Sequence, residues 1–122
     1  MEAVSALPGH KRYRHFVKVV ADTETAWGLW QDGWAMVATD DGEMAFPLWP
    51  AKVYAELCAV GEWAGYEAAE IEVEDLLGEL LPMLERDGVQ PAVFMTTQSK
   101  GVTSATAVLS NDLRQELDRY CG

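Results

Sequence analysis

The residues of this chain with the most familiar catalytic chemistry are two histidines and one pair of adjacent carboxylates. His10 and His15 lie five positions apart in a segment with helical periodicity. A zinc-binding pair on one helix face takes a spacing of about four residues, as in H-E-x-x-H, so this spacing favours two surface histidines over a metal site. Asp40 and Asp41 could carry out acid–base chemistry, but Gly42 follows them directly. Asp before Gly is typical of a tight hairpin turn, and we interpret the pair as turn residues.

Other signatures of catalysis are missing from the sequence. It contains no G-x-S-x-G motif and no glycine-rich phosphate loop, and Lys100 lacks the preceding glycine of a P-loop. Cys58 and Cys121 show no metal-type spacing, and we expect two reduced thiols, with a disulfide as the minority interpretation. We therefore expect no catalytic residue, no metal and no cofactor. An enzyme is the less favoured interpretation, and it stays open because a fold can bring distant residues together.

Tryptophan is the richest feature of the sequence, with five residues from Trp27 to Trp63. Such side chains can line a ligand pocket or anchor an interface, and they also fill the core of a small sheet protein. The core interpretation is favoured. At the corner formed by residues 47–50, one proline suits a strand end and the other suits the first turn of a helix. Trp49 is expected to fill this corner against Trp34, and a binding site that uses both rings is the secondary interpretation.

Charge is distributed unevenly along the chain, which has 20 acidic and 9 basic residues and a net charge of −11. This charge argues against nucleic acid or an anionic membrane as a partner and is compatible with a basic protein partner, although many proteins are acidic only for solubility. Residues 53–85 contain no lysine or arginine. The carboxylates of that stretch are Glu56, Glu62, Glu67, Glu70, Glu72, Glu74, Asp75, Glu79 and Glu85. The first helix is basic instead, so the molecule is polarised; its cations are Lys11, Arg12, Arg14 and Lys18.

The spacing of apolar residues predicts four helices. They cover residues 9–21, about 51–60, 74–86, and a last segment that Ser110 can cap. Pro82 predicts a kink or a last turn that is not α-helical in the third helix. The expected apolar faces are Tyr13, Phe16, Val17 and Val20; then Val53, Leu57 and Val60 with Tyr54 and Cys58 beside them; then Leu76, Leu77, Leu80, Leu81 and Leu84; and finally Leu113, Leu117 and Tyr120.

Two turn signals predict a three-stranded meander between the first two helices. Asp32-Gly33 and Asp41-Gly42 are both typical of type I′ hairpins. Closing each as a two-residue loop pairs Gln31 with Trp34 on the first ladder. The same rule gives three pairs on the second ladder: Trp34 with Trp49, Val37 with Phe46 and Ala35 with Leu48. Both faces of such a meander are apolar, which predicts that both are at least partly covered.

Three shorter strands complete the expected sheet. In the strand 70–74, Glu70, Glu72 and Glu74 alternate with Ile71 and Val73, so the three carboxylates are expected on one solvent face. The segments 91–97 and 101–108 predict two more strands, with a turn at Ser99-Lys100-Gly101 between them. The fold class is therefore α+β, a single domain over residues 1–122 with a mostly antiparallel sheet, an N-terminal helix, the meander, and further helices packed on the sheet. With no secretory signal or apolar run, we expect a cytoplasmic protein.

Four stretches carry a resemblance to a known family: LPGHKRYRHFVKVVADTETAWGL, MAFPLWPAKVYAELCA, IEVEDLLGELLPML and PAVF. Together they resemble the bacterial family catalogued as domain of unknown function 2750, from about Leu7 to Leu117. The most specific elements are Arg12-Tyr13…Phe16, Trp27-Gly28-Leu29 and the corner 47–50. Met95 follows the strand 92–94 where the family usually has proline. The family has no established activity, so the resemblance implies a fold and a bacterial cytoplasmic setting and transfers no catalytic residue.

The interpretation favoured by the sequence is a non-catalytic interaction domain whose acidic middle segment meets a basic protein partner. An immunity protein that neutralises a basic toxin is one concrete version. The binding residues expected are Trp34, Trp49, Glu70, Glu72 and Glu74. The alternative is a small-molecule binding or enzymatic domain with a tryptophan-lined pocket near Pro47–Pro50.

Overall fold

The computed structural model describes residues 9–38, 42–96, 102–103 and 105–121. Its elements follow the order that the sequence predicts: helix, three strands, helix, strand, helix, two strands, helix. The helices are α2 (Gly9–Thr23), α3 (Lys52–Cys58), α4 (Val73–Asp75), α5 (Leu81–Asp87) and α6 (Thr106–Cys121), with a 3-10 turn η1 (Gly61–Trp63) and a π-helical turn η2 (Leu76–Leu80). The strands are β1 (Thr25–Trp30), β2 (Val37–Ala38), β3 (Met44–Leu48), β4 (Glu67–Glu72), β5 (Gln90–Val93) and β6 (Val102–Thr103).

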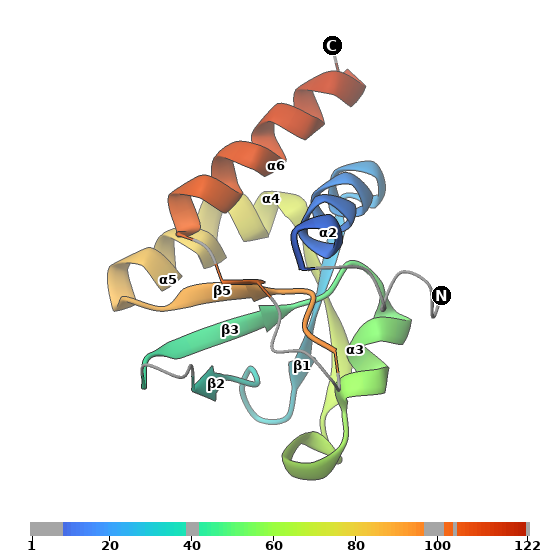
Figure 1. The fold of residues 1–122 in the computed structure, drawn as a ribbon, viewed down its shortest axis with the longest axis vertical. Helices are drawn as coiled ribbons and strands as arrows, with labels where there is room; N and C mark the ends of the chain where they lie inside the picture. Colours follow the sequence, from blue (N-terminus) through green and yellow to red (C-terminus); the bar gives the residue numbers. More distant parts are fainter. Residues whose placement is uncertain (1–8, 39–41, 97–101, 104, 122) are drawn as a thin grey trace.

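The strands form two small sheets (Figure 1), and the fold class is α+β as predicted. β1 pairs antiparallel with β4, while the second sheet has the order β2-β3-β5-β6, in which only β3 and β5 are parallel among the described pairs. The prediction of a three-stranded meander is wrong. β1 pairs with β4 along all six of its residues, and β2 is only two residues long and pairs with β3.

Both predicted two-residue turns are longer loops. Trp30 pairs with Trp34 across the first loop, and Ala38 pairs with Met44 across the second. An odd number of loop residues displaces the register by one, so the expected pairs Gln31–Trp34 and Val37–Phe46 do not form. Val37 lies opposite Ala45 instead.

Each loop nevertheless contains a residue from its predicted turn with a positive φ. Asp32 and Gly42 have left-handed backbone angles, with φ of 57° and 82°. Asp and Gly are among the residues that adopt this conformation at least cost. The remaining turn residues Asp40 and Asp41, like the predicted turn 99–101, lie outside the described residues.

The two sheets meet at Trp27 and Trp49. The Trp27 N–H donates to the Trp49 carbonyl at 2.9 Å, and the Trp49 N–H donates back to the Trp27 carbonyl at 2.8 Å. Trp49 follows β3 directly, so this reciprocal pair joins the first sheet to the end of the second. The predicted pair of Trp34 with Trp49 is therefore wrong.

Helices cover the sheets and enclose the core. α6 packs against both α2 and α5, and α3 packs against β1 and β4 (Figure 1). In α2 the predicted apolar face is confirmed, since Phe16, Val17 and Val20 are buried. α6 begins at Thr106, four residues before the expected cap Ser110, because the weak strand predicted at 101–108 shortens to β6.

The predicted apolar face of α3 is wrong in part. Leu57 and Val60 are 54% and 57% exposed, and the buried residues are Tyr54, Ala55 and Cys58. The helix ends at Cys58, so Val60 lies beyond its last turn. Helix periodicity predicted that Tyr54 and Cys58 lie beside the buried face of α3. Because α3 packs on β1 and β4, these two residues are on the buried face itself.

The helix is irregular before Pro82 and not after it. The last turns form the α-helix α5, so the predicted alternative of a last turn that is not α-helical is wrong. The segment Leu76–Leu80 is π-helical, and the Leu81 N–H donates to the carbonyl of Leu76, five residues back. Proline lacks an N–H and cannot continue a regular helix ladder, which a π turn accommodates. The wide turn marks the junction of α4 and α5.

We predict that Gly42→Val lowers the free energy of unfolding by about 1 kcal/mol or more, because a β-branched residue resists the positive φ found at this position. Urea unfolding measures the change. Gly78→Val is the matched control, since Gly78 lies in η2 and a side chain there meets open space. Equal urea midpoints for the two variants would contradict a left-handed turn at Gly42.

Candidate functional site

A groove of about 540 Å³ lies beside β4 and the helical segment that follows it. We call it the acidic groove. Its lining residues are Trp34, Glu70, Ile71, Glu72, Asp75, Glu79, Leu80 and Met83. Four of these side chains are carboxylates and four are apolar or aromatic, so the groove is amphipathic.

The alternation of β4 positions two of the carboxylates. Glu70 and Glu72 are exposed, while Ile71 between them is buried against the core. The chain then turns from strand to helix at Val73, which ends the alternation. Glu74 therefore lies in α4 and not on the strand, so the predicted single row of three carboxylates is wrong.

One stripe of the following helix completes the acidic groove. Asp75, Glu79 and Met83 are four residues apart in sequence, so they recur about once per helical turn. Met83 is 38% exposed although it is apolar. Their spacing is a signal in the sequence, and it becomes informative once the helix is known to begin at Val73.

The Trp34 ring is held by neighbours from both sheets. A Cβ atom on Gly28 of β1 would lie 2.9 Å from the ring carbon Cζ3, so the absence of a side chain at Gly28 makes room for the ring. Phe46 of β3 packs at a centroid distance of 5.6 Å, and Trp30 meets the ring edge-on at 5.0 Å. Trp34 is consequently half-buried, with its ring packed against residues of both sheets.

The charges of the acidic groove are not neutralised within the described part of the chain. None of its four carboxylates forms a salt bridge there; the ion pairs found are Arg86–Asp87 and Arg119–Glu116, both elsewhere. Like charges on one surface reinforce one another's potential. The groove can therefore attract a cation, while Trp34 and the apolar lining can pack against an aliphatic or aromatic portion of the same ligand.

The structure brings together three of the five binding residues expected from the sequence. Trp34, Glu70 and Glu72 line the acidic groove. Glu74 is exposed but does not line it. Trp49 has no exposed surface, so its ring is unavailable to a ligand in this conformation.

The corner near Pro47–Pro50 is part of the core. The Trp49 indole Nε1 donates to the Met95 carbonyl at 2.8 Å, and the ring meets Trp63 edge-on at 6.4 Å. The Cys58 thiol donates to the same carbonyl at 3.5 Å. Burial raises the pKa of Cys58, which opposes formation of a nucleophilic thiolate. Nothing in this geometry favours a ligand pocket at the corner.

Among the described residues, His15 belongs to no group of three or more possible metal ligands. His15 packs against Phe94 with a centroid distance of 6.0 Å, and burial lowers the pKa of its imidazole. The side chain of His10 lies outside the described residues. Within the described ranges, no three His, Cys, Asp or Glu side chains are grouped to hold a metal ion. Within the same ranges, no helix is long and apolar enough to span a membrane.

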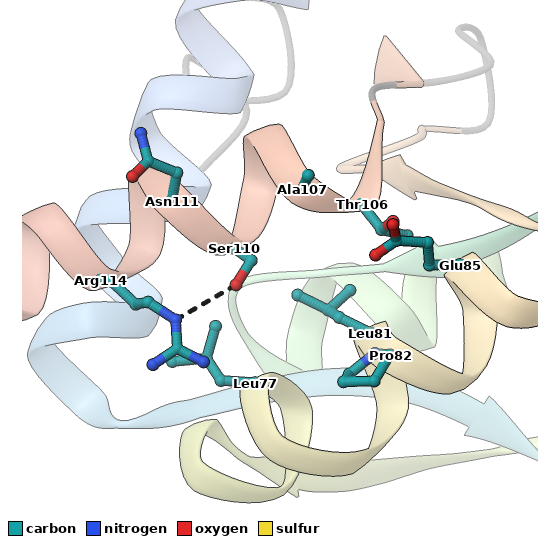
Figure 2. Close-up of a pocket in the computed structure, with 9 residues that line it drawn as sticks. All are labelled: Leu77, Leu81, Pro82, Glu85, Thr106, Ala107, Ser110, Asn111 and Arg114. Atoms are coloured by element: carbon teal, nitrogen blue, oxygen red, sulfur yellow. Dashed lines mark hydrogen bonds between the residues drawn. The ribbon is translucent and has the colours of Figure 1, made fainter.

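A second groove, of about 340 Å³, lies between α5 and α6 (Figure 2). We call it the α5–α6 groove. Its lining residues are Leu77, Leu81, Pro82, Glu85, Thr106, Ala107, Ser110, Asn111 and Arg114. It differs from the acidic groove because it holds one charge of each sign.

A match to one family model shows which family the chain belongs to. A family model described as "Protein of unknown function (DUF2750)" matches residues 13–113. The chain belongs to this family. No curated protein and no solved structure matches the chain. Every residue of the acidic groove lies within the segment that defines DUF2750, so this groove is built from the family's own domain.

We predict that Trp49→Ala costs about 3–5 kcal/mol of unfolding free energy, the usual range for a buried large aromatic residue. Trp49→Phe keeps an aromatic ring but loses the Nε1 hydrogen bond, so it should cost less. Chemical denaturation measures both. A fully stable Trp49→Ala variant would show that the corner does not support the fold.

We predict that Gly28→Ala displaces the Trp34 ring, because the new methyl group would lie 2.9 Å from it. The measurement is the NMR signal of the Trp34 indole N–H, assigned by comparison with Trp34→Phe. Gly78→Ala, which meets open space, should leave this signal unchanged. An unshifted signal in Gly28→Ala would contradict the packing described for Trp34.

Proposed function

We propose that this DUF2750 protein is a non-catalytic interaction domain whose acidic groove binds a basic segment of a partner protein. The observation that carries the proposal is the combination, in one groove, of a packed tryptophan ring with four carboxylates that have no salt-bridge partner in the described part of the chain. Carboxylates attract and orient the cationic groups of a partner. Trp34 and Met83 provide the apolar contacts that charge alone does not supply.

The shape of the groove favours a polypeptide segment over a small cation. Acidic residues come from both β4 and the helical stripe of Asp75 and Glu79, so an extended ligand can contact both elements at once. Lysine and arginine side chains carry an aliphatic stem behind the charge. Such a stem can lie on Leu80 and Met83 while the cation faces Glu72 or Asp75.

The setting we propose is the bacterial cytoplasm, with a basic toxin neutralised by this chain as one concrete kind of partner. The free thiol of Cys58 supports a reducing compartment. The net charge of −11 supports a basic partner, because long-range attraction between opposite charges raises the rate of association.

We predict that the double variant Glu70→Lys/Glu72→Lys loses the partner that the wild-type protein captures from its native lysate at low salt. Reversing two charges in the acidic groove repels a basic segment. The measurement is affinity capture at low and at high ionic strength, followed by the dissociation constant for the purified partner. Because the attraction is electrostatic, high salt should weaken wild-type binding.

The matched control is Glu56→Lys/Asp118→Lys, which makes the same change in net charge at two exposed positions outside the groove. It should retain the partner, and circular dichroism should show an intact fold for both double variants. Equal loss in the two would mean that overall charge, not the groove, attracts the partner. Full retention by Glu70→Lys/Glu72→Lys would remove the acidic groove as the binding surface.

A further inference from the structure

The α5–α6 groove has opposite charges at its two ends. Figure 2 shows Arg114 of α6 at one end and Glu85 of α5 at the other, with Leu81 and Pro82 between them. Glu85 and Arg114 do not pair with each other in the described structure. Arg114 donates from Nε to the Ser110 hydroxyl at 3.3 Å, which holds the guanidinium along the groove.

Thr106 adds a largely buried residue with a hydroxyl to the lining of this groove. Thr106 is only 6% exposed, and among the described residues its side chain has no hydrogen-bond partner. No fully buried side-chain oxygen in the described structure lacks a partner, so the Thr106 oxygen must keep some exposure. Thr106 is one of the residues that line the groove. A hydroxyl can accept a hydrogen bond from an ammonium group or donate one to a carbonyl.

We propose that the α5–α6 groove binds a short peptide with both termini free. Its ammonium group lies at Glu85 and the Thr106 hydroxyl, its carboxylate lies at Arg114, and its apolar side chains pack on Leu77, Leu81 and Pro82. Arginine recognises carboxylates through its paired N–H groups. This site is separate from the acidic groove, and it does not depend on the function proposed for that groove.

The length of the groove limits the size of this peptide. Ser110 and Arg114 follow Thr106 by four and eight residues, which corresponds to about 6 and 12 Å along the helix. An extended chain spans roughly 3.3–3.6 Å per residue, so two or three residues match the separation of the charged ends. The volume of about 340 Å³ lies at the lower end of the range of small-ligand sites.

The dipole of α6 disfavours this orientation of the peptide, but its effect is smaller than that of the Glu85 charge. The N-terminus of a helix carries about half a positive charge, which disfavours an ammonium group near Thr106. Glu85 brings a full negative charge to the same end of the groove (Figure 2). The net field at that end therefore still attracts a cation.

The test uses the tripeptide Ala-Leu-Ala and the full chain, followed by NMR of the backbone amides. The free peptide should shift the amides of α5 and of residues 106–114. N-acetylation or C-amidation should each weaken binding by about fivefold, as expected for loss of one exposed ion pair. In Glu85→Gln the acetylated and free peptides should bind equally. In Arg114→Gln the amidated and free peptides should bind equally.

Glu74→Gln is the control, since this exposed carboxylate lies outside both grooves, and it should preserve both differences. Absence of shifts at millimolar peptide would overturn the proposal. Equal binding of the N-acetylated peptide to the wild-type chain would also overturn it, because the groove would then recognise only a carboxyl terminus.

Discussion

The reciprocal pair of backbone hydrogen bonds between Trp27 and Trp49 is the contact on which the relative position of the two sheets depends. Trp27 belongs to the sheet of β1 and β4, and Trp49 directly follows the strand β3 of the other sheet. The Trp49 indole also holds the chain after β5 through the Met95 carbonyl. Trp34 contacts Gly28 in one sheet and Phe46 in the other, so the tryptophan of the acidic groove is placed by this junction. The same junction therefore organises both the core and the acidic groove, although Trp49 itself is buried and does not line the groove.

A buried arginine of α2 supports the chain next to that junction. Arg12 of α2 is buried and donates from Nε to the carbonyl of Phe94 at 3.1 Å. Phe94 has a positive φ of 55°, which is costly for a bulky residue, and its N–H donates to Leu48 at 2.8 Å. Charged and backbone hydrogen bonds thus stabilise a strained position directly after β5. These contacts involve residues of the stretches that carry the family resemblance, and the acidic groove takes most of its lining residues from a further such stretch, residues 71–84.

Local pattern in the sequence predicted the order of the elements and the core face of α2, because periodicity within one element depends only on neighbouring residues. It did not predict that β1 pairs with β4, since alternation shows which face of a strand is buried and not which strand lies beside it. The predicted registers are displaced by one residue because three and five residues, not two, separate the paired positions at the turns. For the acidic groove, composition identified Glu70 and Glu72, while Asp75 and Glu79 required the position of the strand-to-helix turn. The helix start at Thr106, and with it the α5–α6 groove, depended on tertiary contacts of α6.

The central claim is that Trp34 and the carboxylates of β4 and the following helix form one binding surface. The most direct measurement is an NMR titration of the ¹⁵N-labelled chain with a basic amphipathic peptide, such as one that alternates leucine with lysine and arginine. The account predicts that the Trp34 indole N–H and the backbone amides of residues 70–83 shift together, with one common dissociation constant. Shifts confined to α2 or α3, or a Trp34 signal that stays in place while β4 responds, would contradict it.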